Sequence, residues 1–154
     1  MTELIYSFNT KFHPTLAEVG GKALSLISTT RAGFPVPGGF VLCVAFFKPW
    51  TDKLKQTAEW KALSASPIQE NCNKVKAIAE KLTLTDEQRS LMDKAMTEIE
   101  GTTFFAVRSS SPEEDLEGVS FAGMYETVLG TTRDKLDTAI AKVYSSMLDF
   151  RIME

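Results

Sequence analysis

The most informative stretch of this 154-residue sequence is Thr103-Phe-Phe-Ala-Val-Arg-Ser-Ser110. Its apolar run predicts a buried β-strand that ends in a polar loop. Because Arg108 stands at the exit of that strand, its base is fixed and its guanidinium can reach into a cleft. The planar fork of the guanidinium suits phosphate oxygens. The residues alone leave open a second interpretation, in which Arg108 pairs with Glu114 or Asp115 across the loop.

Further strands are predicted on both sides of this segment. Residues Phe121 to Gly130 form another strand-like run, which could pair with the first, although the connecting loop is too long for a tight hairpin. Residues Leu4 to Phe8 alternate apolar and polar side chains, and Phe40 to Cys43 follow a proline-stiffened turn. These runs predict a small, mainly antiparallel sheet.

Helical patterns fill the rest of the chain. One helix should open close to Gly20 and Gly21 and stop at Gly33. A block of three helices is predicted between the early strands and Gly101, and a last helix follows Thr132. The residues expected on their buried faces are Phe46, Phe47, Trp50, Leu54, Ile68, Cys72, Val75, Ala79, Leu82, Leu91, Met92, Ala95, Ile99, Leu136, Ile140, Val143, Met147 and Phe150.

Two helix starts in the inserted block carry capping-box patterns. Ser66 precedes Gln69 by three residues, and Thr85 precedes Gln88 by three. Pro67 would then occupy the first helical position of its helix, where a missing N–H costs nothing. Pro49 is tolerable only if it lies within the first turn of the helix that carries Trp50.

Composition limits the function classes. With 17 Lys and Arg against 20 Asp and Glu, the net charge of −3 argues against general nucleic-acid binding. No apolar run reaches the length of a membrane span, and the first ten residues do not form a secretion signal. Cys43 and Cys72 stand singly and are expected to be buried, whereas His13 is expected on the surface and cannot build a metal site. We therefore expect one cytoplasmic region, 1–154, without a second domain.

Two shorter motifs add candidate phosphate ligands. Gly20 and Gly21 let a backbone approach a ligand closely, the N–H groups at a helix start attract anions, and Lys22 adds a mobile positive charge. A glycine pair also fits a plain turn. Gly123 lies inside a strand pattern, which indicates close approach by a ligand or another backbone, and Thr127 could donate its hydroxyl to a phosphate. The alternatives are a β-bulge at Gly123 and a surface threonine.

Taken together and in order, these motifs resemble the amino-terminal ATP-grasp domain of the phosphoenolpyruvate synthase and pyruvate phosphate dikinase family, which rifamycin phosphotransferases also carry. The likeness rests on V-G-G-K near residue 20, G-F-P-V-P-G-G-F, F-A-V-R-S-S, E-D and S-F-A-G-x-x-E-T. It implies an α+β fold, the first part of an ATP-grasp-like domain, with a helical block inserted beside a small sheet. Ala23 departs from the asparagine that the family often has, and Met124 and Tyr125 replace two glutamines usual in the synthases.

The resemblance implies a phosphotransferase segment that binds ATP, whose phosphate passes to a histidine on another domain and then to pyruvate or another acceptor. Lys22 and Arg108 would act as catalytic residues by neutralising the phosphate charge. The complete implied ATP site is Gly20, Gly21, Lys22, Arg108, Gly123 and Thr127. Two alternatives stay open: a segment of a rifamycin-type antibiotic phosphotransferase, and a non-catalytic module that binds a nucleotide or a partner chain.

The resemblance also implies parts that lie elsewhere. In the family, the carboxylates that bind Mg²⁺, the carrier histidine and the pyruvate-binding barrel follow the position that matches Glu154, and His13 does not match the carrier. We therefore expect no metal ligands in this chain, one wall of a nucleotide cleft, and no activity of the chain alone. An exposed apolar surface would then favour self-association.

Overall fold

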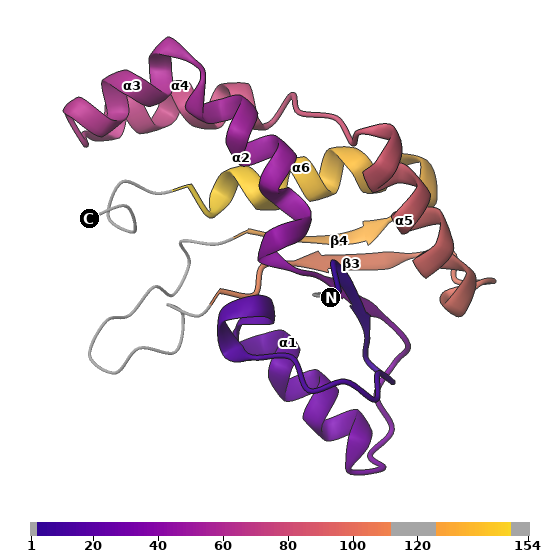
Figure 1. The fold of residues 1–154 in the computed structure, drawn as a ribbon. Helices are drawn as coiled ribbons and strands as arrows, with labels where there is room; N and C mark the ends of the chain where they lie inside the picture. Colours follow the sequence, from indigo (N-terminus) through magenta and orange to yellow (C-terminus); the bar gives the residue numbers. More distant parts are fainter. Residues whose placement is uncertain (1–2, 112–125, 149–154) are drawn as a thin grey trace. The chain divides into compact units, whose positions relative to one another are not determined.

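The computed structural model describes residues 3–111 and 126–148 (Figure 1). They form two compact units, each assembled from three separate segments. The described part of the first unit comprises residues 3–47, 84–102 and 110–111, and that of the second comprises 48–83, 103–109 and 126–148. The expectation of a single domain stays a prediction, and each unit is described by itself.

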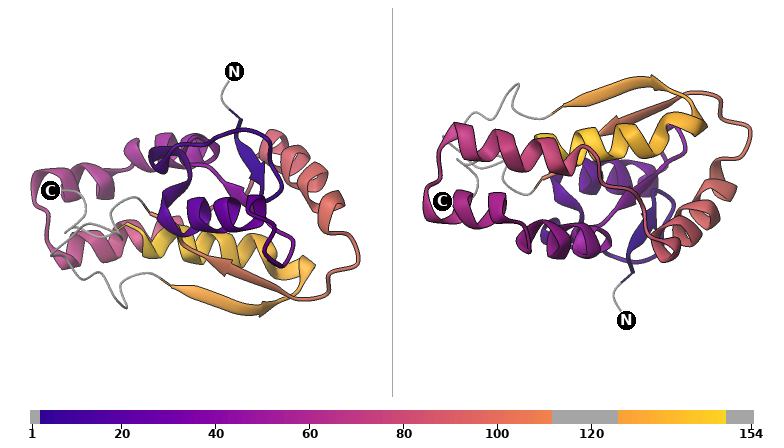
Figure 2. Two further views of the ribbon diagram at one scale, coloured as in Figure 1. Left: turned by 90° about the horizontal axis from the view of Figure 1, so that it is seen from below. Right: turned by 90° about the horizontal axis from the view of Figure 1, so that it is seen from above.

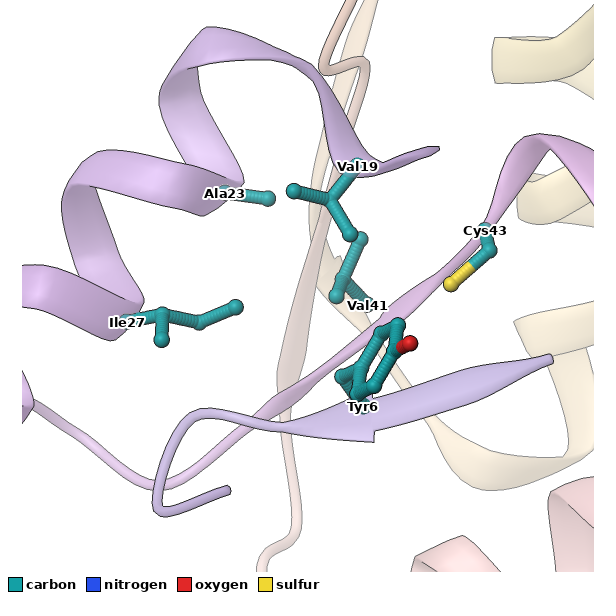
Figure 3. Close-up of a cluster of buried hydrophobic side chains, with 6 residues drawn as sticks. All are labelled: Tyr6, Val19, Ala23, Ile27, Val41 and Cys43. Carbon is teal, nitrogen blue, oxygen red and sulfur yellow. The ribbon is translucent and has the colours of Figure 1, made fainter. Parts of the chain in front are cut away.

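The first unit contains one antiparallel strand pair and two helices. Its elements are β1 (Ile5–Ser7), α1 (Leu16–Arg31), β2 (Phe40–Leu42), the 3-10 turn η1 (Val44–Phe47), α5 (Asp86–Met96) and the 3-10 turn η2 (Thr97–Ile99). Tyr6 lies opposite Val41 in the β1–β2 pair, which confirms both predicted early strands. Six residues form the buried cluster between this pair and α1 in Figure 3: Tyr6, Val19, Ala23, Ile27, Val41 and Cys43.

Helix α1 begins earlier than the glycines that were expected to open it. The backbone N–H of Thr15 donates to Glu18 Oε2 at 2.7 Å, and its hydroxyl donates to the same oxygen at 2.9 Å. This capping arrangement starts a short helical turn, which Gly20 interrupts with a φ of 76° and a ψ of 168°. Regular helix resumes at Gly21, close to the predicted start, and Gly33 follows its end with a φ of 87°.

The second unit contains the other strand pair and four helices. Its elements are α2 (Lys48–Lys55), α3 (Ala58–Ala65), α4 (Gln69–Ala79), β3 (Phe105–Arg108), β4 (Thr127–Thr131), the 3-10 turn η4 (Arg133–Lys135) and α6 (Leu136–Ser146). β3 and β4 pair antiparallel, the pairing that the sequence left possible, and helices α3 and α4 lie side by side (Figure 1). The fold is thus α+β with two small antiparallel sheets in place of the one expected.

The predicted capping box at Ser66 is wrong. Ser66 terminates α3, a helix that the sequence patterns missed, and its extended conformation leads into the connection to α4. Helix α4 begins at Gln69, and its N-cap residue Ile68 makes no side-chain capping bond and is 47% exposed. The box failed because the serine is already used at the end of the preceding helix. The Thr85 box is confirmed, with the Gln88 N–H donating to Thr85 Oγ1 at 3.2 Å.

Burial follows the predicted stripes with local exceptions. Cys72, Val75 and Leu82 are buried as expected, whereas Leu91 and Ile99 are only half-buried. Met92, which was predicted to be buried, and Met96, which was not, take the core positions of α5. Ile99 lies beyond the end of that helix, in a 3-10 turn with a different period. Phe46 and Phe47 likewise lie in η1 and not in the helix that carries Trp50, while Pro49 is in the first turn of α2, as required. Phe150 lies outside the described residues.

Aromatic side chains join α2 to α6 within the second unit. Trp50 packs edge-on against Tyr144 with ring centroids 5.2 Å apart, and the indole N–H donates to the carbonyl of Thr83 at 2.9 Å. The hydroxyls of Tyr144 and Thr51 are 2.9 Å apart. Burial raises the pKa of Tyr144, so its hydroxyl is the neutral hydrogen-bonding form at ordinary pH. These contacts hold α6 in place beside the strands that carry the candidate site.

Candidate functional site

Strand pairing in the second unit brings two predicted phosphate ligands together. Arg108, the last residue of β3, lies directly opposite Thr127, the first residue of β4. Residues that face each other across an antiparallel pair point to the same side of the sheet. Both side chains are exposed. The pair therefore presents a guanidinium and a hydroxyl side by side, which is a suitable arrangement for a phosphate group.

The opposite face of this strand pair packs on α6. Phe105, Val107 and Val128 are half-buried, and α6 lies along β3 and β4 in both views of Figure 2. Alternation along the strands then turns Arg108 and Thr127 away from α6. The candidate ligands accordingly occupy the open face of a sheet whose other face is fixed by a helix.

A β-bulge interrupts the same strand pair. Phe105 pairs with Thr131 and Val107 with Val128, so Leu129 and Gly130 together oppose Ala106. Gly130 has a φ of 63°, a left-handed conformation that glycine adopts without steric cost. Gly123, where a bulge was the alternative to a ligand contact, lies outside the described part of the chain. The proposed role of Gly123 accordingly stays a prediction.

In the first unit, the start of α1 is held by Ser110. The backbone N–H of Ala23 donates to Ser110 Oγ at 2.9 Å, so this serine caps the helix from a distant part of the sequence. A Cβ on Gly20 would lie 2.3 Å from the carbonyl carbon of Ser110. The close approach that Gly20 permits in this structure is therefore to Ser110. Ser110 was not predicted as a cap, because its partner is 87 residues away and no local pattern marks it.

Lys22 follows this glycine pair on the exposed side of α1, whereas its neighbour Ala23 is 4% exposed and belongs to the core cluster. Lys22 lies in the first unit and Arg108 in the second, so a shared cleft for their charged ends stays a prediction. The alternative partners of Arg108, Glu114 and Asp115, lie outside the described residues.

The remaining titratable candidates have structural surroundings. His13 is exposed, as expected, and its Nδ1 is 2.8 Å from Nη1 of Arg31. Cys43 and Cys72 are buried thiols that form no disulfide. Burial, followed by the charges of Glu18 and Glu3, raises the pKa of Cys43 to about 12. Within residues 3–111 and 126–148, no three of His, Cys, Asp and Glu gather to hold a metal ion, and no helix is long and apolar enough to cross a membrane.

Comparison with known proteins identifies the family. The pyruvate phosphate dikinase AMP/ATP-binding domain matches residues 16–154, and the chain therefore belongs to this family. It is 30% identical to an uncharacterized phosphotransferase, YvkC, of Bacillus subtilis over 86% of this chain and 15% of that protein. It is also 30% identical to a probable phosphoenolpyruvate synthase of Archaeoglobus fulgidus, over 84% of this chain and 19% of that protein.

An antibiotic-modifying enzyme is among the relatives as well. The rifampicin phosphotransferase of Streptomyces sviceus is 29% identical over 74% of this chain and 14% of that protein. In all three comparisons the chain thus spans less than one fifth of the relative's length. The family match defines an ATP-binding segment of a family that includes phosphoenolpyruvate synthases and phosphotransferases.

Proposed function

We propose that this chain binds ATP for a phosphotransferase that passes a phosphoryl group to a histidine on another domain and then to pyruvate or another acceptor. In this proposal Lys22 and Arg108 hold the phosphates as catalytic residues. The other members of the proposed site are Gly20, Gly21, Gly123 and Thr127. The observation that carries the proposal is the pairing of Arg108 with Thr127 on an exposed sheet face.

Covalent geometry supports the inclusion of Lys22 in the same site. Arg108 precedes Ser110 by two residues, so their Cα atoms lie within about 7 Å of each other in any arrangement of the two units. Ser110 in turn bonds to the N–H of Ala23, the residue after Lys22. The chain therefore ties the base of Arg108 to the start of the helix that carries Lys22. In this proposal, both long side chains act on a common phosphate cluster.

The proposed ligands suit phosphoryl transfer, which requires mainly positioning and charge neutralisation. The fork of Arg108 can bind two phosphate oxygens at once, and the hydroxyl of Thr127 can donate to a third. The ammonium of Lys22 is a compact charge on a flexible stem. At about 4 Å from a phosphate near a protein surface, such a charge gains on the order of 4 kcal/mol before desolvation is subtracted.

Mg²⁺ normally accompanies ATP in this type of reaction. It prefers carboxylate and phosphate oxygens, and the described residues provide no cluster of carboxylates that fits it. In our proposal its protein ligands lie outside this chain, and the residues named above act on the phosphates directly. The two buried cysteines, which form no disulfide, agree with a reducing compartment, and we propose the cytoplasm.

The similarity to a rifampicin phosphotransferase favours a second candidate with the same ATP chemistry and a different acceptor. We propose in both cases that the chain alone transfers no phosphate from ATP, because the carrier histidine would lie on another domain. A transfer assay with pyruvate and with rifampicin tests this. Turnover by the purified chain would contradict it.

Self-association of the chain also stays a proposal. Phe104 and Leu129, which are 65% and 73% exposed, are candidate contacts. Analytical sedimentation of the purified chain measures its oligomeric state.

Titration calorimetry with ATP tests the proposed site. Lys22→Ala and Arg108→Ala should each weaken binding by roughly 2–4 kcal/mol, the range for a lost charged hydrogen bond that leaves a phosphate unpaired. Arg133→Ala is the matched control, because Arg133 is exposed in the same unit just beyond the far end of β4. The ATP affinity of the Arg133→Ala variant should equal that of the wild type. A large loss of melting temperature in Arg108→Ala with unchanged ATP affinity would show instead that Arg108 is structural.

A further inference from the structure

The end of α6 holds the start of β4 through a buried hydroxyl. The backbone N–H of Glu126 donates to Ser146 Oγ at 3.1 Å, and the Ser146 hydroxyl donates to the carbonyl of Val143 at 2.6 Å. Ser146 is 9% exposed, and both of its hydrogen bonds lie within the second unit. The hydroxyl therefore links the helix backbone to the residue that immediately precedes Thr127.

Strand geometry makes this link important for Thr127. Thr127 is the first residue of β4, and the bulge at Leu129 and Gly130 interrupts regular pairing two residues later. The stretch of regular strand pairing that aligns Thr127 with Arg108 is consequently short. Short strand ends fray unless another contact holds them. The bond from Glu126 to Ser146 is such a contact, on the side of Thr127 away from the bulge.

The direction of the neighbouring side chains agrees with this role. Glu126 Oε2 is 3.5 Å from Nζ of Lys142 in α6, so Glu126 points toward the helix. Alternation then directs Thr127 to the open face beside Arg108. The carboxylate and ammonium are each about half exposed, and exposed ion pairs contribute little. The buried hydroxyl is therefore the stronger of the two connections.

We propose that Ser146 is a positioning residue of the nucleotide site: its hydroxyl fixes the Glu126 backbone and so holds the Thr127 hydroxyl opposite the Arg108 guanidinium. This inference rests on the proposed function. Ser146 does not touch the nucleotide in this scheme; it acts through Glu126 on the alignment of two phosphate ligands.

Ser145 provides a matched control within the same helical turn. It is 1% exposed, and its hydroxyl donates to the Lys76 carbonyl of α4 at 3.2 Å, away from β4. Ser145→Ala and Ser146→Ala thus each remove a buried hydroxyl from the end of α6. A merely structural role predicts the same outcome for both: lower stability and unchanged ATP affinity of the folded chain.

The experiment combines ATP calorimetry with hydrogen exchange of the Glu126 amide in the nucleotide-free chain. Ser146→Ala should weaken ATP binding about fivefold, the change that corresponds to one lost hydrogen bond, and should accelerate exchange at Glu126. Ser146→Thr keeps the hydroxyl and should restore both. Ser145→Ala should leave ATP affinity and Glu126 exchange unchanged. In the wild-type chain, the Glu126 amide should already be protected, a measurement that needs no variant.

The outcomes separate this inference from the proposed function. If Arg108→Ala weakens ATP binding but Ser146→Ala does not, the positioning role is wrong and the site stands. If the wild-type Glu126 amide exchanges freely, the link itself is absent and the inference is wrong. If Arg108→Ala binds ATP as the wild type does, the proposed function fails and the role of Ser146 in it fails too.

Discussion

The two units hold their candidate phosphate ligands by different means. In the first unit, Lys22 stands on a helix whose start is held by the side-chain hydroxyl of Ser110, which comes close because Gly20 has no side chain. In the second unit, Arg108 and Thr127 stand on paired strands that side chains and a buried hydroxyl fix against α6. Both units therefore use a serine hydroxyl, and the first depends in addition on the absence of a side chain at Gly20.

This difference extends beyond the site. Within residues 3–111 and 126–148, three of the glycines with positive φ, Gly20, Gly33 and Gly101, belong to the first unit, and Gly130 belongs to the second. Both units contain helical side chains with at most 2% exposure: Val19 and Ile27 in the first, and Trp50, Leu54, Leu63, Cys72, Val75 and Ala79 in the second. Substitutions that add atoms at these glycines should thus damage the first unit more than the second, whereas substitutions that remove buried side-chain atoms should damage either unit.

The largest expected effect concerns the thiol in the core of the first unit. With the pKa of Cys43 raised to about 12 by burial, its thiolate population at pH 8 falls roughly a thousandfold below that of an unfolded cysteine. Alkylation of Cys43 by iodoacetamide should therefore be slower in the native chain by about that factor or more, since access is also blocked. Mass spectrometry of a labelling time course measures it, with urea-unfolded chain as the reference. Rapid native labelling would show that this core opens readily.

Gly20→Ala should give the next largest effect. The new Cβ would meet the Ser110 backbone at 2.3 Å, and the φ of 76° disfavours any side chain. Together these effects should lower the free energy of unfolding by about 3 kcal/mol or more. Gly33→Ala is the control, because its φ is 87° but no atom lies within 4 Å of the added Cβ. It should cost only about 1 kcal/mol. Urea denaturation that gives equal losses would contradict the close packing at Gly20.

Sequence patterns predicted the elements whose signal is local. The early strands, the Thr85 capping box and the pairing of the Arg108 strand with a later one are all confirmed. Each depends on a local signal: alternation, a short apolar run, or a cap and its partner three residues apart. Helix α3 was missed, and Ser66, which ends it, was assigned to the next helix. A serine between two helices can serve either one, so its side-chain type alone cannot decide.

The sequence predicted the residue types of the candidate site, but not the hydrogen bonds and strand pairing that connect them. The Arg108–Thr127 pairing combines a local strand signal with a register that no single segment encodes. The contacts of Ser110 with Ala23 and of Ser146 with Glu126 join residues 87 and 20 positions apart. Such hydrogen bonds depend on tertiary packing, and isolated serines carry no periodic signal. They could be found only once the chain was folded.

Ser110→Ala tests the side-chain hydroxyl that supports the start of α1 in the first unit, at a smaller scale. Removal of the hydroxyl leaves the Ala23 N–H without its capping acceptor and should lower the free energy of unfolding by about 1 kcal/mol. Ser28→Ala is the control, since Ser28 is exposed in the same helix, and it should change stability by less than about 0.5 kcal/mol. Chemical denaturation of both variants provides the comparison. Equal stability of the two would show that Ser110 does not cap α1.

The smallest effect is a pH dependence that both units should share. Hydrogen bonds from the N–H and hydroxyl of Thr15 lower the pKa of Glu18 in the first unit, and a bond with the Thr132 side chain lowers that of Asp134 in the second. A carboxylate whose pKa is lowered on folding stabilises the folded state above its unfolded pKa of about 4, and this contribution is lost as the pH falls through the folded value. Glu18→Gln and Asp134→Asn should therefore be slightly less stable than the wild type at pH 7. Because protonation removes the same charge from the wild type, these differences should vanish near pH 2. Thermal denaturation of the wild type and both variants between pH 7 and pH 2 measures these differences. A difference that persists at the lowest pH would show that the shape of the side chain, and not its charge, is responsible for the stabilisation.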